Sequence, residues 1–300
     1  MKRMSIIKLR KVWYAFSGIV VGGSILAVAV FGLKFGIDFT GGSFLSARFE
    51  KAPAPLEVEQ SLASLNLGSM TVQPVGEKDI NVRLAALDED SHQAVLKALR
   101  ERFGDVNELQ FTSFGPSIGR ELRNKSIFAL VLIFISILIY IAWAFKKVSA
   151  PIAAWKYGVI TITTAFHDII LPVGLFAILG KIYGAEIGTP FIAAILTIMG
   201  YSINDTIVVL DRVRENLQRS TGDFEVIVEN SVRQTLPRSL NTTLTTLLAL
   251  VAVFLFGGVS IRDFSLALIV GIATGAYSSI FIAAPMLVTW NNWSRRKKRV

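Results

Sequence analysis

The stretch FIAAILTIMGYSINDTIVVL, residues 191–210, places one acidic residue, Asp205, inside an otherwise uncharged and mostly apolar run. A helix of this length rises about 30 Å, which matches the hydrocarbon thickness of a bilayer. A charged side chain at the centre of such a helix costs about 2.5–3.5 kcal/mol on insertion scales, so it usually faces a bundle interior or water. The stretch therefore predicts a membrane span that contains a polar site.

Further stretches along the chain have the same length and character. The chain is 52% hydrophobic and its mean hydropathy is +0.55, both high for a soluble protein. The predicted spans are residues 12–31, 127–145, 158–179, 191–210, 240–256 and 264–288. These runs predict a polytopic α-helical membrane protein with six transmembrane helices.

Basic residues mark the predicted cytoplasmic side of these spans. They gather in the amino-terminal segment 1–11, at residues 146–147 and in the tail 291–300, whereas the two short outer loops carry only Lys181 and Arg262. This positive-inside distribution predicts that both termini are cytoplasmic. The net charge of +9 is then a topology signal with contacts to the lipid bilayer, and we expect no nucleic-acid partner.

The amino-terminal apolar run has two interpretations. Its basic start and the residues Ala27, Val28 and Ala29 resemble a signal peptide with its cleavage site. The apolar run is longer than the usual stretch of about 7 to 15 residues, which favours retention as the first span.

Residues 32–126 form the only sizeable block outside the spans, and the topology makes it periplasmic. Strand patterns at 43–49, 69–75, 79–84 and 106–114 alternate with helix patterns at 56–65 and 91–103. Ser91 has the character of the N-cap of the second helix. The order strand–helix–strand–strand–helix–strand predicts a small ferredoxin-like α+β extracytoplasmic domain.

Residues 211–237, between the fourth and fifth spans, mix charges with periodic apolar residues. The pattern predicts an amphipathic helix on the cytoplasmic membrane surface, with an apolar side made of Phe224, Ile227, Val228 and Val232.

The chain carries no convincing enzyme motif, and we expect no catalytic activity. The nearest approach to a phosphate loop, Gly174 to Lys181, is one residue too long and lacks the Ser or Thr that would hold magnesium. With no cysteine and two histidines, His92 and His167, we also expect no metal site and no cofactor.

Glycines recur in two patterns. Gly18-x-x-x-Gly22 and Gly271-x-x-x-Gly275 predict close helix packing. The segment FGIDFTGGSF, residues 35–44, predicts a tight turn into the first strand, with anion capture by the turn as the less favoured alternative.

Polar side chains recur at helical spacing in three of the spans. At about 1.5 Å per helical residue, Asp205 lies roughly 8 Å from the inner end of its span and Asp168 roughly 15 Å from the inner end of its own. The third span carries Thr161, Thr164, His167 and Asp168, and the fourth carries Thr197, Tyr201, Asn204 and Asp205. The fifth carries Thr242 and Thr245, and Arg238 stands just before it.

These stripes predict a hydrated polar path through the cytoplasmic half of a helix bundle. Burial and a nearby arginine act in opposite directions on the proton affinity of a carboxyl group. Moving Arg238 relative to Asp205 would therefore switch proton binding, as a proton carrier requires. The alternative is a static polar cluster that fixes helix register.

Several long segments resemble the SecF family of protein-export membrane subunits, which belongs to the RND transporter superfamily. They occur in the family's order and span nearly the whole chain. The segments are GIDFTGGS (36–43), FGPSIGREL (114–122), HD (167–168), GYSINDTIVVLDRVREN (200–216), LPRSLNTTLTTLL (236–248) and GGVSIRDFSLALIVGIATGAYSSIFIAAP (257–285).

The resemblance implies an RND-like half in the bacterial inner membrane that pairs with SecD. The pair would use the proton motive force late in translocation, pulling the preprotein or preventing its backsliding. Implied partners are SecD, the translocating preprotein, the Sec channel of SecY, SecE and SecG, and the associated factors YajC and YidC.

The resemblance assigns the proton relay to Asp205 and Arg238. It leaves a supporting role for other polar residues within the membrane, namely His167, Asp168, Asn204, Thr242 and Thr245. The residues do not distinguish protons from sodium ions as the coupling ion.

Two other functions remain open. One is an RND-type exporter of small molecules or lipids, although a single outer block of modest size argues against it. The other is a non-conducting scaffold of the export channel, in which the polar stripes are only structural.

Overall fold

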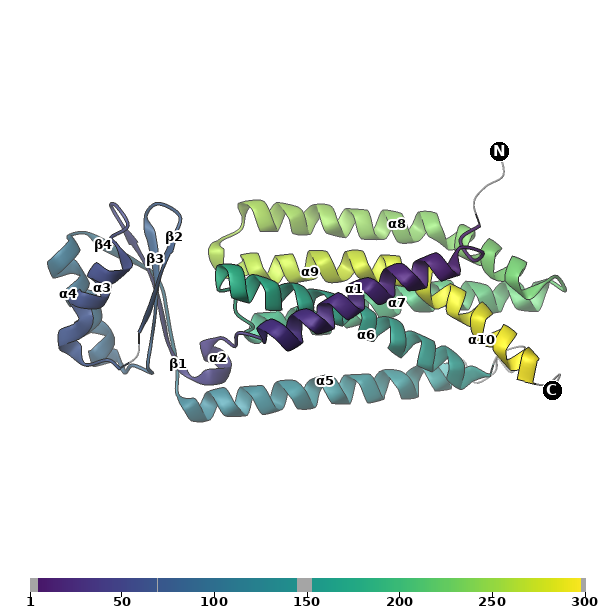
Figure 1. The fold of residues 1–300 in the computed structure, drawn as a ribbon, viewed down its shortest axis with the longest axis horizontal. Helices are drawn as coiled ribbons and strands as arrows, with labels where there is room; N and C mark the ends of the chain where they lie inside the picture. The colour runs from purple at the N-terminus through teal and green to yellow at the C-terminus, as the bar shows by residue number, and fades with distance from the viewer. Residues whose placement is uncertain (1–4, 69, 145–152, 298–300) are drawn as a thin grey trace. The chain divides into compact units, whose positions relative to one another are not determined.

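The computed structural model describes residues 5–68, 70–144 and 153–297 (Figure 1). Sequence predictions for residues 1–4, Ser69, 145–152 and 298–300, which include parts of the basic segments, lie outside the described residues. The chain divides into two compact units. We call them the helical unit, Met1–Lys34 with Ala129–Val300, and the α+β unit, Phe35–Phe128.

Six helices in the described part of the chain are long and apolar enough to cross a membrane, which confirms the predicted polytopic fold. Each is longer than its apolar run, because backbone hydrogen bonding continues where apolar side chains end. The helices are α1 (Arg10–Phe31), α5 (Pro116–Ala144), α6 (Ala154–Tyr183), α7 (Thr189–Arg219), α8 (Phe224–Phe256) and α9 (Val259–Ser278), which continues through a π turn (Ser279–Ala283) into α10 (Ala284–Lys297).

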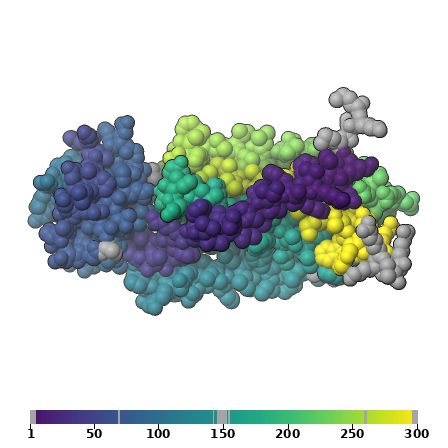
Figure 2. All heavy atoms as spheres, in the orientation of Figure 1, coloured from purple at the N-terminus to yellow at the C-terminus, as the bar shows by residue number. Residues whose placement is uncertain are grey.

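The exterior of the helical unit is apolar. Large side chains such as Ile19 on α1 and Phe256 at the end of α8 are 75% and 87% exposed. Figure 2 shows α1, in purple, running across the near face of this unit with its length uncovered. In water such a surface would be unfavourable, whereas a bilayer solvates it.

The prediction of a separate amphipathic helix over residues 211–237 is wrong. Instead, α7 continues to Arg219 and α8 already begins at Phe224, with Pro237 inside it. The predicted apolar side does not meet lipid, because Phe224, Val228 and Val232 are buried in the core of the helical unit. The amphipathic pattern was real, but other helices of the same chain cover its apolar face.

The α+β unit has the predicted ferredoxin-like topology. Its four strands form one sheet in the order β2-β3-β1-β4, with every neighbouring pair antiparallel. The sheet and two helices enclose an apolar core that includes Leu45, Val58, Ile80 and Leu99. The elements are α2 (Ile37–Thr40), β1 (Gly42–Phe49), α3 (Pro55–Leu62) with a 3₁₀ turn (Ala63–Leu65), β2 (Thr71–Val75), β3 (Asp79–Leu84), α4 (Glu89–Phe103) and β4 (Val106–Phe114).

The predicted N-cap of α4 is wrong by three residues. Asp88 is the N-cap, and its carboxylate accepts a hydrogen bond of 3.0 Å from the backbone N–H of Ser91. This interaction with Ser91 lowers the pKa of Asp88 below its ordinary value. A carboxylate also interacts favourably with the helix dipole, which explains why Asp88 and not Ser91 starts the helix.

The glycines of the segment 35–44 allow close backbone packing. Gly41 and Gly42 have φ angles of 77° and 131°, which disfavour any side chain. A Cβ atom on Gly41 would lie 2.8 Å from Cα of Pro116, and one on Gly42 would lie 2.8 Å from the carbonyl oxygen of Leu84. This packing accounts for the glycine pair as a structural turn, without a bound anion.

Candidate functional site

A close contact between α1 and α6 sets the register of these two helices. Gly174 of α6 faces Ser24 of α1 so closely that a Cβ atom on Gly174 would overlap it. Seven residues earlier on each helix, Nε2 of His167 lies 3.2 Å from Oγ of Ser17. Equal spacing on both helices means that they run parallel, so the glycine contact positions Ser17 at the imidazole.

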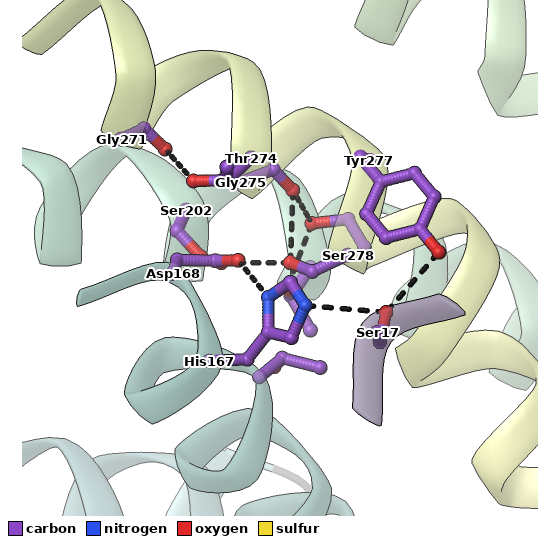
Figure 3. A network of polar contacts seen from close by, with 12 residues as sticks. Ser17, His167, Asp168, Ser202, Gly271, Thr274, Gly275, Tyr277 and Ser278 are labelled. Atoms are coloured by element: carbon purple, nitrogen blue, oxygen red, sulfur yellow. Dashed lines mark hydrogen bonds and ion pairs between the residues drawn. The ribbon is translucent and has the colours of Figure 1, made fainter. Parts of the chain in front are cut away.

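Asp168 lies at the centre of a hydrogen-bond network that joins four helices (Figure 3). Its side chain is 0% exposed. Oδ1 lies 2.8 Å from Nδ1 of His167, and Oδ2 accepts hydrogen bonds from the hydroxyls of Ser202 on α7 and, at 2.7 Å, Ser278 on α9. On the far side of the imidazole, Ser17 of α1 continues to the hydroxyl of Tyr277 at 3.1 Å.

The helices α7 and α9 also pack in parallel, and the predicted glycine motif of α9 explains how. Gly271 leaves room for the side chain of Ile198, and a Cβ atom on Gly275 would lie 3.0 Å from Cβ of Ser202. One turn further, the hydroxyls of Thr206 and Ser279 lie 2.8 Å apart. The motif Gly271-x-x-x-Gly275 is therefore a packing motif, as predicted, and it brings the serines of α9 to α7.

The other predicted glycine motif makes no such contact. A Cβ atom on Gly18 or Gly22 of α1 would meet nothing within 4 Å among the described residues. These two glycines therefore do not set the packing of this chain.

Asp205 belongs to a second polar contact, between α7 and α8. Both of its carboxylate oxygens accept from the hydroxyl of Ser239, at 2.8 and 2.7 Å. One turn away on α7, the hydroxyl of Tyr201 lies 3.3 Å from that of Thr246. Ser239 is buried, whereas Asp205 is only partly buried, so this carboxylate lies at the boundary of the helical unit.

The remaining predicted residues lie on the surface of this chain. Arg238, Asn204, Thr242 and Thr245 are all exposed. The two threonine hydroxyls donate to carbonyl oxygens of their own helix, at 2.7 and 3.0 Å. No ion pair joins Asp205 to Arg238 among residues 5–68, 70–144 and 153–297. We call the four exposed side chains on α7 and α8, Asn204, Arg238, Thr242 and Thr245, the polar face.

No metal centre is formed in the part of the chain that the structure describes. That part contains no group of three or more His, Cys, Asp or Glu side chains that could hold a metal ion. What the geometry offers is instead a set of hydroxyl, imidazole and carboxyl groups, which can exchange protons.

Comparison with known proteins places the chain in a family. Residues 94–293 match the family described as protein export membrane protein SecD/SecF, C-terminal, and residues 26–53 match the SecD/SecF GG motif. A protein translocase subunit SecF from Thermobaculum terrenum is 42% identical, over 96% of this chain and 94% of its own length. The corresponding subunit from Anaerolinea thermophila is 38% identical, over 98% and 97%.

The chain belongs to the SecF family. Its fold is also that of a solved relative, the translocon-associated membrane protein SecDF from Thermus thermophilus, at 31% identity and a TM-score of 0.84. The match covers 97% of this chain but 39% of the SecDF chain, so this chain spans well under half of that protein. A super-membrane-facing form of SecDF matches with a TM-score of 0.70, again at 31% identity.

Within this SecF-family chain, the structure brings together only part of the predicted set. His167 and Asp168 share one network, Asp205 lies in another contact, and Arg238 lies on the polar face. Both polar contacts depend on hydroxyl groups that the sequence did not single out. These are Ser17, Ser202, Ser239, Tyr277 and Ser278.

One of the missed residues had a signal in the sequence. Ser202 precedes Asp205 by three residues, so it lies on nearly the same side of the helix as a charge already singled out. Ser278 and Ser279 stand next to each other in an apolar run, with no charge to draw attention to them.

Proposed function

We propose that this chain is the SecF half of a SecD–SecF complex that uses the proton motive force in the late steps of protein translocation. In this role it is a transport subunit and not an enzyme. Asp205 binds and releases the proton, and Arg238 controls that step by moving toward or away from it. The complex then pulls the preprotein outward or prevents its backsliding.

The position of Asp205 is the observation that carries this proposal. Its carboxylate is held by the buried Ser239 but remains partly exposed at the edge of the helical unit. A group in this position can exchange a proton directly with a neighbouring polar region, whereas a fully enclosed carboxylate needs hydrogen-bonded side chains that connect it to the exterior. Moving one elementary charge through 100 mV provides about 2.3 kcal/mol, enough to shift a marginal equilibrium between two arrangements.

The polar face supports a second membrane half as the partner. Arg238, Asn204 and Thr245 are exposed on a unit whose large exposed side chains are mostly apolar. A charged side chain facing lipid is costly, so this face requires another protein or water against it. The solved SecDF relative is a longer chain, 39% of which this chain covers, and a SecD subunit is the natural occupant.

The remaining assignments follow from this role. We place the protein in the bacterial inner membrane with both termini cytoplasmic, on the basis of its basic segments. The further partners that we propose are the SecY, SecE and SecG channel, the factors YajC and YidC, and the preprotein. No resident cofactor is needed, because the gradient supplies the energy.

The decisive experiment is Asp205→Asn in vesicles that contain the Sec channel, its ATPase and this chain with SecD. We expect the part of export that depends on a proton gradient to fall at least about tenfold, since a positioned proton-transfer group contributes about a hundredfold or more. The matched control is Asp211→Asn, which removes an exposed acid on the same helix that pairs with Arg214 at 3.2 Å.

Three outcomes would overturn the proposal. Undiminished gradient dependence in an assembled Asp205→Asn complex would leave the chain as a scaffold. Export driven equally well by a sodium gradient alone would replace the proton as the coupling ion. Recovery of the chain with an outer-membrane channel instead of the Sec channel would indicate an exporter of small molecules or lipids.

A further inference from the structure

We propose that His167 and Asp168 form a second proton-binding site in the helical unit, distinct from Asp205 and acting in the same transport cycle. This inference rests on the proposed function, because it adds a site to the proton path. It gives a specific role to a pair that the sequence left as supporting polar residues.

The hydrogen-bond pattern locates the proton of this pair. Both serine hydroxyls donate to Oδ2 of Asp168, whereas Oδ1 faces Nδ1 of His167 at 2.8 Å. The proton shared by acid and imidazole therefore lies between Oδ1 and Nδ1. It can reside on either atom without moving any heavy atom.

Because the pair is buried, its net charge, and therefore the number of protons it binds, has a large effect on its free energy. An ionised Asp168 beside a neutral imidazole would leave one uncompensated charge in the interior, which is expensive. A neutral acid beside a neutral imidazole avoids this, and so does a carboxylate beside an imidazolium. Each of these two forms holds one proton more than the charged form, so the pair gains or loses a proton as a unit.

Among the described residues, no cation other than a protonated His167 is in contact with Asp168 to balance its charge. In the described part of the chain, Asp168 has ion-pair contact with His167 alone. The elements packed against the pair contribute two further titratable groups, Tyr277 of α9 and Asp205 of α7, while α1 contributes the hydroxyl of Ser17. Neither of these titratable groups can supply a positive charge.

The network accommodates both protonation states. The hydroxyl of Ser278 lies 2.7 Å from Oδ2 of Asp168 and 3.1 Å from the carbonyl oxygen of Gly275. When Oδ2 no longer needs this donor, the hydroxyl can turn to the carbonyl without losing a hydrogen bond.

The pair also has connections on both sides. Through Ser17, the imidazole reaches the half-buried Tyr277 at the contact of α1 with α9. On the other side, Ser202 lies on α7 one turn before Thr206, whose hydroxyl contacts Ser279 at the start of the π turn. Asp205 follows Ser202, which donates to Asp168, by three residues on the same helix, so a charge on one carboxyl group acts on the other through the interior of the unit.

The π turn adds an independent indication. It covers Ser279–Ala283 and begins directly after the residue that donates to Asp168. Single π turns within α-helices occur frequently at functional sites. By contrast, Thr161 and Thr164 on the same helix as the pair donate only to carbonyls of their own helix, as expected of residues without a partner in the network.

The first test uses the unmodified full-length chain. It contains two histidines, so ¹⁵N-histidine labelling gives two imidazoles, and His92→Gln assigns them. We expect the two ring-nitrogen signals of His167 to change with pH as the pair gains or loses its shared proton, and Asp205→Asn to alter that response. Ring-nitrogen signals of His167 that do not respond to pH would overturn the proposal, because loss of the shared proton from either atom changes the hydrogen bond at Nδ1.

The second test uses variants in the vesicle assay with SecD present. We expect Asp168→Asn and His167→Gln to lower gradient-dependent export at least about tenfold. Thr163→Val is the matched control, because its exposed hydroxyl on the same helix bonds only its own helix, and it should stay within about twofold of wild type. If Asp168→Asn does not assemble with SecD, the export assay of His167→Gln and the spectra of the labelled wild-type chain still test the proposal.

The outcomes separate this inference from the proposed function. Loss of gradient dependence in Asp205→Asn, together with its retention in Asp168→Asn and His167→Gln, refutes only the second site. Retention in Asp205→Asn refutes the proposed function, whatever the other two variants do.

Discussion

The two units of this chain differ in how many polar side chains they bury beside their apolar cores. In the described residues of the α+β unit, the buried polar side chains are Ser43, Asn81 and His92, within an apolar core. The helical unit buries a larger polar set along its helices, in addition to its apolar core. The buried members are Ser17, Thr161, Thr164, His167, Asp168, Ser202, Thr206, Ser231, Thr235, Ser239, Thr243, Ser265, Ser278, Ser279 and Asn291.

The difference follows from the solvent of each unit. In water, burial of apolar surface drives folding, so apolar residues mark the interior. In a bilayer the exterior is as apolar as the core, so it is the polar residues that mark helix contacts. The same type of side chain therefore contributes differently to the stability of the two units. Substitutions of leucine and glycine test this difference.

The largest effect is expected from Leu99→Ala in the α+β unit. Leu99 is 0% exposed in the core of this unit. Its truncation should cost about 3 kcal/mol through lost burial and an unfilled cavity. The measurement is hydrogen exchange of the β1 and β3 amides in the full-length chain.

The comparison partner for this variant is Leu248→Ala on α8. Leu248 is 63% exposed on the helical unit, where lipid solvates it, so the change should stay below about 0.5 kcal/mol. Equal losses of stability in the two variants would show that leucine side chains contribute equally to folding in both units.

A somewhat smaller effect is expected from Gly271→Val. The added Cβ atom would overlap the side chain of Ile198, forcing α7 and α9 apart at a cost of about 2 kcal/mol. Thermal unfolding of the purified chain in detergent measures this loss. Gly18→Val is the control, since its Cβ atom would meet nothing within 4 Å in this chain, and matching losses would contradict the packing role of Gly271.

Much of the fold could be predicted because it depends on length and period. Six apolar runs give six spans, and the alternation in residues 32–126 gives the ferredoxin-like order. The exceptions depended on contacts that no local pattern contains. Val228 and Val232 looked like lipid-facing residues because the sequence does not show which helices cover them.

The site was predictable only in its charges. Asp168 and Asp205 stand out because an ionisable group in an apolar run is costly to insert into a membrane and therefore indicates a functional site. Ser202 and Ser278 do not stand out, since a serine in a helix can satisfy its hydroxyl on its own backbone and fits any surface. Only the parallel packing of α7 and α9, set by Gly271 and Gly275, reveals that these hydroxyls meet at Asp168.

The smallest effect concerns charge on the α+β unit, in the ion pair that Arg48 and Asp79 form at its surface. The guanidinium of Arg48 donates to Asp79 at 2.7 and 2.8 Å and lowers the pKa of Asp79 below its ordinary value. A lowered pKa in the folded state stabilises the fold above the ordinary value of 3.8, and this contribution is lost as the pH falls through the lowered pKa.

Asp79→Asn should therefore speed exchange of the paired Ala47 and Ile80 amides by roughly twofold at neutral pH, as expected of an exposed pair. The ratio of variant to wild-type exchange should approach one as the pH falls below the lowered pKa, because the wild-type carboxylate is then protonated as well. High salt should shrink the neutral-pH ratio too, since it screens an exposed pair. A ratio that does not change with pH would mean that Asp79 acts through packing, and that charge has no role in the stability of this unit.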